Sequence, residues 1–142
     1  MTARRLALAL GLSLAAAGAS ALEPLCVPDA QTLCLEGGRF SVVAFYQPTL
    51  EGPSFPGNAV PLTDDSGYFW FFDAANVEMI TKVLNGCGLP PGAYWFFAAG
   101  LTNVGVNIVV KDLAAGATRL YQNELGAAFV PIQDTSAFTT CP

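Results

Sequence analysis

Four carboxylic acids lie close together in the sequence and are the residues best suited to chemistry: Asp64, Asp65, Asp73 and Glu78. A glycosidase needs only two carboxyl groups about 5–10 Å apart, one as acid and one as base or nucleophile. However, the runs Asp-Asp-Ser-Gly and Asp-Ala-Ala-Asn are typical of turns, because aspartate bonds the backbone just after it. We therefore expect turn residues here and no catalytic residue.

The same acids suggest a calcium site, since Ca²⁺ takes six to eight oxygen ligands and suits extracellular loops. Residues 63–66 would supply several oxygens, with Asp73 one strand away. An extended strand from Asp65 to Asp73 would span roughly 25 Å, so the two groups should lie at opposite strand ends. The EF-hand pattern is also missing. We expect no metal and no cofactor.

The chain contains no histidine, which excludes Ser-His-Asp and Cys-His nucleophilic sites and zinc sites with a histidine ligand. Its cysteines are Cys26, Cys34, Cys87 and Cys141, without the C-x-x-C spacing of a zinc site. An even number of cysteines in an exported protein indicates disulfides. Three pairings are possible; we favour 26–34, which can form locally, and 87–141, which would hold the C-terminal end.

Two aromatic segments, residues 68–72 and 94–97, are the other candidates for function. Successive strand side chains point to opposite faces, and a sandwich buries only one face of each sheet. Either these strands are covered on both sides, or one aromatic row is exposed and can stack on sugar rings or bind a protein. Our ligand-binding candidates are Tyr68, Trp70, Tyr94 and Trp95. The alternative is that both tryptophans are core residues and the proline-rich segment 47–57 covers the second row.

Short β-type runs alternate with turn signals along the chain, at the spacing typical of a sandwich or barrel. We expect strands at 39–46, 59–63, 68–72, 77–84, 93–98, 104–112 and 117–122, with one more near Phe129. The fold class is thus all-β: an antiparallel sandwich of seven to eight strands, Ig-like in general architecture, with an open β-barrel as alternative. The segments from Gly67 and from Gly92 also resemble each other, which indicates either a duplicated hairpin or chance.

Residues 1–21 are typical of a cleavable signal peptide: Arg4 and Arg5 precede an apolar run that ends in Ala19-Ser20-Ala21. Residues 22–142 then form one domain, in which four basic residues stand against eleven acidic ones, a net charge of −7. Such a surface repels phosphate backbones, so we expect no nucleic-acid partner. We also expect no membrane insertion, and secretion to the extracellular space or the periplasm.

Several motifs resemble an uncharacterised family of small secreted bacterial β-domains. The matching segments are LTDDSGYFWFF at 62–72, NVE at 76–78, KVLNG at 82–86 and DTSAF at 134–138, and the resemblance runs from about Cys26 to the C-terminus. It implies an exported, modular β-domain. Because this family has no assigned activity, the resemblance implies no catalytic or binding residue.

Together these features predict a non-enzymatic extracellular β-domain that acts as a binding or adhesion-type module for a protein or a glycan. One alternative is a structural, envelope-associated domain with a fully covered aromatic core. A second alternative is a protease-inhibitor-like protein that would use a rigid loop at residues 84–92, braced by Cys87.

Overall fold

The computed structural model describes residues 25–142, and the predicted signal peptide at 1–21 lies outside them. The described residues contain strands and no helix. The strands are β1 (Leu33–Leu35), β2 (Phe40–Gln47), β3 (Phe55–Pro56), β4 (Asn58–Pro61), β5 (Ser66–Trp70), β6 (Met79–Gly86), β7 (Ala93–Gly100), β8 (Gly105–Asp112), β9 (Ala117–Asn123) and β10 (Ile132–Phe138).

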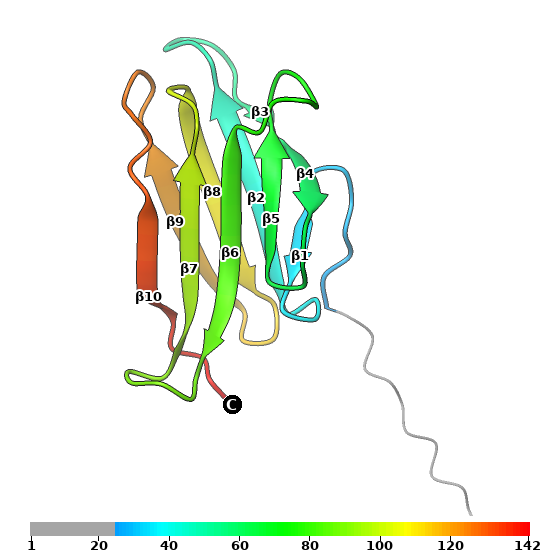
Figure 1. The fold of residues 1–142 in the computed structure, drawn as a ribbon, viewed down its shortest axis with the longest axis vertical. Coiled ribbons are helices and arrows are strands. Elements are labelled where there is room, and N and C mark those ends of the chain that lie inside the picture. The colour runs from blue at the N-terminus through cyan, green and yellow to red at the C-terminus, as the bar shows by residue number, and fades with distance from the viewer. Residues whose placement is uncertain (1–24) are drawn as a thin grey trace, which may run out of the picture.

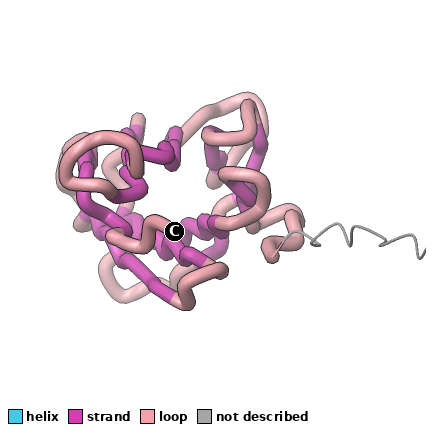
Figure 2. The backbone as a smooth tube through the Cα atoms, turned by 90° about the horizontal axis from the view of Figure 1, so that it is seen from below, coloured by secondary structure: helices cyan, strands magenta, loops and turns pink. Residues whose placement is uncertain are grey.

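These strands form two antiparallel sheets of five strands each (Figure 1). One sheet has the order β1-β2-β8-β9, with β3 paired to β2, and the other has the order β10-β7-β6-β5-β4. Viewed from the end that holds the C-terminus, the strands lie in layers around a common interior (Figure 2). The predicted antiparallel sandwich is confirmed, and the sheets do not close into a barrel. Two expectations are corrected: there are ten strands, because β1 and β3 are too short to show a pattern, and the strand expected near Phe129 lies later in the chain, as β10.

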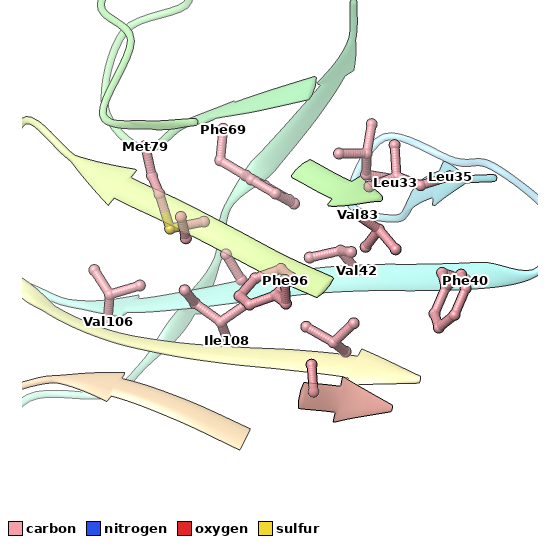
Figure 3. Packing of buried hydrophobic residues seen from close by; sticks show 14 of the residues in the cluster. Leu33, Leu35, Phe40, Val42, Phe69, Met79, Val83, Phe96, Val106 and Ile108 are labelled. Carbon is pink, nitrogen blue, oxygen red and sulfur yellow. The ribbon is translucent and has the colours of Figure 1, made fainter. Parts of the chain in front are cut away.

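Burial alternates along the central strands, so every second side chain faces inward. In β2 the buried positions are Phe40, Val42 and Ala44, and in β8 they are Val106, Ile108 and Val110. The second sheet contributes Phe69, Met79, Val83 and Phe96, which point into the same core (Figure 3). Burial of such a side chain stabilises the fold by roughly 1.5–3 kcal/mol, so this core is the main source of stability.

Polar contacts join the two sheets along their edges. On one side, Arg119 of β9 donates from Nε to the Ala137 carbonyl at 2.7 Å, and the Tyr121 hydroxyl donates to Asp134 at 2.9 Å. On the other side, the Ala59 amide of β4 donates to the carbonyl of Ala30, in the segment that leads into β1, at 2.9 Å. The sheet edges are therefore fastened to each other.

Two disulfides complete the framework, Cys26–Cys34 and Cys87–Cys141, and they confirm the favoured pairing. Such bonds persist in oxidising compartments, so they indicate a location outside the cytoplasm. Within residues 25–142, no helix has the length and apolar character needed to cross a membrane.

The resemblance between the two aromatic segments does not reflect a duplicated hairpin. β5 and β6 pair with each other in one sheet, whereas β7 and β8, the corresponding strands of the second segment, belong to different sheets. The two segments share an alternation of aromatic side chains, with Trp70 and Trp95 both half-buried and Phe71 and Phe96 both in the core. Chance similarity between aromatic strands accounts for this.

Candidate functional site

The outer face of the β10-β7-β6-β5-β4 sheet carries most of the predicted aromatic candidates. Residues paired across an antiparallel sheet lie on the same face. Tyr68 therefore shares its face with Ile80 of β6 and Ala99 of β7, and the row next to it contains Ser66, Lys82, Phe97 and Gln133. A third row pairs Leu84 with Trp95. Tyr68, Trp70 and Trp95 are all half-buried on this outer face.

The two tryptophans do not form one site. Trp70 pairs with Asn58 at one end of β5, while Trp95 lies two strands and three cross-strand rows away. At 3.3 Å per residue along a strand and 4.8 Å between strands, this separation is on the order of 20 Å. No single sugar ring or side chain can contact both indoles.

Tyr94 lies on the opposite face of the same sheet, in the core, where it is 4% exposed. Its ring packs against Phe40 at 4.9 Å between centroids, and its hydroxyl accepts a hydrogen bond from Arg39 Nη1 at 2.9 Å. Tyr94 is therefore not part of the outer surface that Tyr68, Trp70 and Trp95 share.

Between the two tryptophans lies a groove of about 420 Å³ on the outer face of β5, β6, β7 and β10. Ile80, Phe97 and Ala99 give it an apolar floor, and Ser66, Lys82 and Gln133 give it polar groups. The volume falls within the roughly 300–1,000 Å³ typical of small-ligand sites. This arrangement of a few polar groups around an apolar surface can hold a small ligand in a fixed orientation.

The groove's only cation is Lys82, whose ammonium lies 3.8 Å from an Asp65 carboxylate oxygen. Both side chains remain substantially exposed, at 43% and 33%, so this ion pair contributes little to stability and leaves the ammonium free to donate elsewhere. The Asp65 carboxylate also accepts a hydrogen bond from the Thr63 hydroxyl at 2.5 Å. Lys82 therefore offers the groove a hydrogen-bond donor, with the Asp65 carboxylate beside it as an acceptor.

Sequence reasoning missed Phe97, Ile80, Lys82 and Gln133 as residues of the groove. A signal was available for the first three, because Phe97 alternates in phase with Trp95, and Ile80 and Lys82 alternate with the buried Met79 and Val83. Gln133 gave no such signal. It reaches the groove only because β10 pairs with β7, a contact between distant parts of the chain.

Trp95 is held in place by close packing on a glycine. A Cβ atom at Gly86 would lie 2.4 Å from the Trp95 Nε1 atom, so the indole rests on the bare backbone of β6. Nε1 is buried, and it is the one such side-chain atom within residues 25–142 without a hydrogen-bond partner. The indole thus contributes a ring face and edge to the surface, and no available hydrogen-bond donor.

The four carboxylates behave as turn and packing residues. Asp73 accepts a hydrogen bond from the Ala75 amide at 2.8 Å, and Asp64 accepts from the Gly37 amide at 3.0 Å. Glu78 is 5% exposed and accepts from the Asn76 amide group. Asp64 and Asp65 precede β5, whereas Asp73 follows it, so they lie at opposite ends of that strand. Within residues 25–142 no group of three His, Cys, Asp or Glu residues could hold a metal ion.

The loop at 84–92 folds into two consecutive turns. The Leu89 amide donates to the Gly86 carbonyl at 3.0 Å, and the Gly92 amide donates to the Leu89 carbonyl at 2.6 Å. Leu89 is 55% exposed at the tip, and the disulfide Cys87–Cys141 holds the loop. An inhibitor loop that binds a protease by strand addition needs an extended backbone. The two tight turns of this loop do not provide one, which argues against an inhibitor loop of that kind at 84–92.

No protein-family model, curated protein or solved structure matches this chain. The resemblance to the family of secreted bacterial β-domains therefore stays a prediction. The site is defined by the chain's own residues: a half-buried aromatic face with a groove at its centre.

Proposed function

We propose that this protein is a secreted, non-enzymatic binding module whose ligand occupies the groove on the outer face of β5, β6, β7 and β10. The signal-peptide pattern at 1–21 and the two disulfides support export. The absence of histidine and the use of Asp64, Asp73 and Glu78 in hydrogen bonds within the protein support a role in binding over one in catalysis.

The observation that carries this proposal is the row Ser66-Lys82-Phe97-Gln133 across four strands. In this row the Phe97 ring lies between the hydrogen-bonding side chains of Lys82 and Gln133. Neighbouring strands lie about 4.8 Å apart, a spacing close to the width of one sugar ring. A glycan fits this chemistry: the apolar face of the ring stacks on Phe97, and its hydroxyls bond to Lys82 and Gln133. A glycan is therefore the ligand class we propose.

A glycan array followed by NMR titration of the strongest hit tests the proposal. We expect Phe97→Ala to weaken binding at least about tenfold, because it removes both the stacking surface and buried apolar area. Gln133→Ala should weaken binding by a smaller factor. Leu120→Ala is the matched control, since Leu120 is an exposed apolar residue of β9 in the opposite sheet, at 74% exposure. Its affinity should equal that of the wild type.

Two results would overturn the proposal. One is the absence of any glycan bound by the wild-type protein at millimolar concentration. The other is a bound glycan whose chemical-shift changes avoid Phe97 and Lys82 and whose affinity is unchanged in Phe97→Ala. The first result would favour the structural, envelope-associated alternative.

A further inference from the structure

Six large apolar side chains are exposed on β3 and on loops at one end of the sandwich. This end lies opposite the C-terminus (Figure 1). We call this region the loop end; it comprises β3 and the loops at 48–54, 71–78, 101–104 and 124–131, which connect strands at that end. Leu50, Leu101 and Val130 are 85%, 78% and 75% exposed, and each projects from a different loop. Phe55, Phe72 and Val77 complete the set. Exposed apolar groups gathered at one end of a domain mark an interaction surface.

Contacts between the loops hold this surface together. The Tyr46 ring lies 5.6 Å from Phe55 and 5.1 Å from Phe72, between ring centroids, which joins β3 to the loop at 71–78. The Leu101 amide donates to the Glu78 carbonyl at 2.8 Å, and this bond joins the loops at 71–78 and 101–104. The bond from the Gly126 amide to the Asn103 carbonyl, at 2.7 Å, joins the fourth loop.

The loop at 48–54 is fixed from below as well. Gln47 Nε2 at the end of β2 donates to the carbonyls of Leu50 and Gly52, both at 3.1 Å. The exposed side chains of the loop end therefore sit on backbone that is fixed by hydrogen bonds and aromatic packing. Because these loops are already ordered, binding a partner there would require little free energy to order them.

The charges of the loop end indicate the kind of partner. Its loops contain neither lysine nor arginine, and Glu51, Asp73 and Glu124 are exposed carboxylates among them. The basic residues of the domain lie on other parts of the sandwich, at Arg39, Lys82, Lys111 and Arg119. Such a surface repels anionic lipid headgroups and attracts a cationic partner.

We propose that the loop end is a docking surface for a protein segment that presents apolar side chains flanked by lysine or arginine. The partner's apolar residues would cover Leu50, Leu101 and Val130, and its basic residues would pair with Glu51 and Glu124. Apolar burial supplies the affinity, while charge complementarity selects the partner and speeds association. The loop end adjoins the groove at Pro131, but none of its six exposed apolar side chains lines the groove, so this proposal does not depend on the ligand proposed there.

The probe is an 18-residue amphipathic peptide of leucine and lysine, titrated into the disulfide-bonded protein and followed by fluorescence anisotropy. We expect saturable binding that weakens as the salt concentration rises. Leu101→Ser/Val130→Ser should weaken binding at least about tenfold, as should Glu51→Lys/Glu124→Lys. Leu62→Ser/Leu89→Ser is the matched control, because both leucines are 55% exposed but belong to the β4–β5 and β6–β7 loops, at the opposite end of the sandwich (Figure 1). This control should bind like the wild type.

Several results would overturn the proposal. One is failure of the wild-type protein to bind the peptide, and another is equal binding by the loop-end variants and the control. A third is equal binding of a peptide with the same composition in scrambled order. Binding to phosphatidylcholine vesicles that is lost in Leu101→Ser/Val130→Ser would assign the surface to a membrane instead.

Discussion

At the residue scale, Arg39 connects more parts of the molecule than its place beside β2 suggests. Its guanidinium donates to both carboxylate oxygens of Asp112, at 3.0 and 2.8 Å, and to the Thr140 carbonyl at 2.8 Å. Its Cζ atom also lies 4.4 Å from the centre of the Tyr94 ring. Asp112 is fully buried, so its charge depends on this partner. Arg39 also donates the hydrogen bond that satisfies the buried Tyr94 hydroxyl. This explains how Tyr94, which we predicted to bind a ligand, can lie in the core.

We predict that Arg39→Met lowers the free energy of unfolding by about 3–5 kcal/mol, because it leaves the Asp112 carboxylate buried without a counter-charge. Urea denaturation followed by circular dichroism measures this loss. Asp65→Asn is the control, since it breaks the exposed pair with Lys82 and should change stability by less than about 1 kcal/mol. Similar losses in both variants would show that the buried Arg39–Asp112 pair contributes no more to stability than the exposed Asp65–Lys82 pair.

The same network makes a prediction about pH. Burial by itself raises the pKa of the Asp112 carboxyl, but hydrogen bonds from Arg39 and Thr140 outweigh it and hold the pKa below its usual value. A lowered carboxyl pKa stabilises the fold above the unfolded-state value of about 3.9, and this contribution is lost as the pH falls through the folded-state pKa. The stability gap between wild type and Arg39→Met should therefore narrow in acid. A gap that stays constant from pH 7 down to pH 2 would contradict this account.

At the scale of elements, most long strands were predictable and the short or late ones were not. β2, β7 and β8 are runs of eight residues rich in aromatic and β-branched side chains, which is a strong local signal for a strand. β3 has two residues and β1 has three, too few for any period to appear. β10 has a polar sequence, Ile-Gln-Asp-Thr-Ser-Ala-Phe, and an irregular pairing after Asp134. Its partner β7 lies far away in the chain, so local pattern could not reveal it.

The candidate site was predictable only in part, for the same reason. The alternation showed that Tyr94 and Trp95 lie on opposite faces of one strand, but not which of the two faces inward. Both faces of β7 carry aromatic side chains, so hydrophobicity alone could not decide. The choice depends on which neighbouring side chains share the face, and in the structure Tyr94 lies with Phe40 and Phe138 in the core.

The bare backbone of Gly86 in β6 supports the Trp95 indole. In Gly86→Ala the new methyl would lie 2.4 Å from Nε1 and 2.7 Å from the Ala93 carbonyl oxygen, so the indole must move. We expect a loss of about 1–3 kcal/mol in stability and a shifted indole N–H signal in the NMR spectrum. Gly88→Ala, two residues later, meets nothing within 4 Å and should change stability by no more than about 0.5 kcal/mol. An unshifted indole signal in Gly86→Ala would disprove the packing described.

At the scale of the whole molecule, the two ends of the sandwich differ in how they are held. The loop end is joined by backbone hydrogen bonds and aromatic contacts between its loops. The opposite end is joined covalently, since the Cys87–Cys141 disulfide ties the loop after β6 to the segment after β10. That segment also holds Thr140, which bonds both Arg39 and Asp112. The end near the C-terminus is therefore cross-linked by a disulfide, while the loop end is held by non-covalent contacts and exposes apolar side chains.

The two disulfides close loops of very different length, so we predict that they contribute unequally to stability. The stabilisation from restricting the unfolded chain grows with the length of the closed loop, and the sequence separations are 54 for Cys87–Cys141 and 8 for Cys26–Cys34. Chain entropy gives about 4 kcal/mol for the first and about 2.5 kcal/mol for the second. Cys87→Ser/Cys141→Ser should thus be the less stable variant in urea denaturation, and it should also loosen the contact of Thr140 with Asp112. If Cys26→Ser/Cys34→Ser proved equally or more destabilised, local packing around β1 would outweigh chain entropy, and the C-terminal staple would not be the stronger of the two.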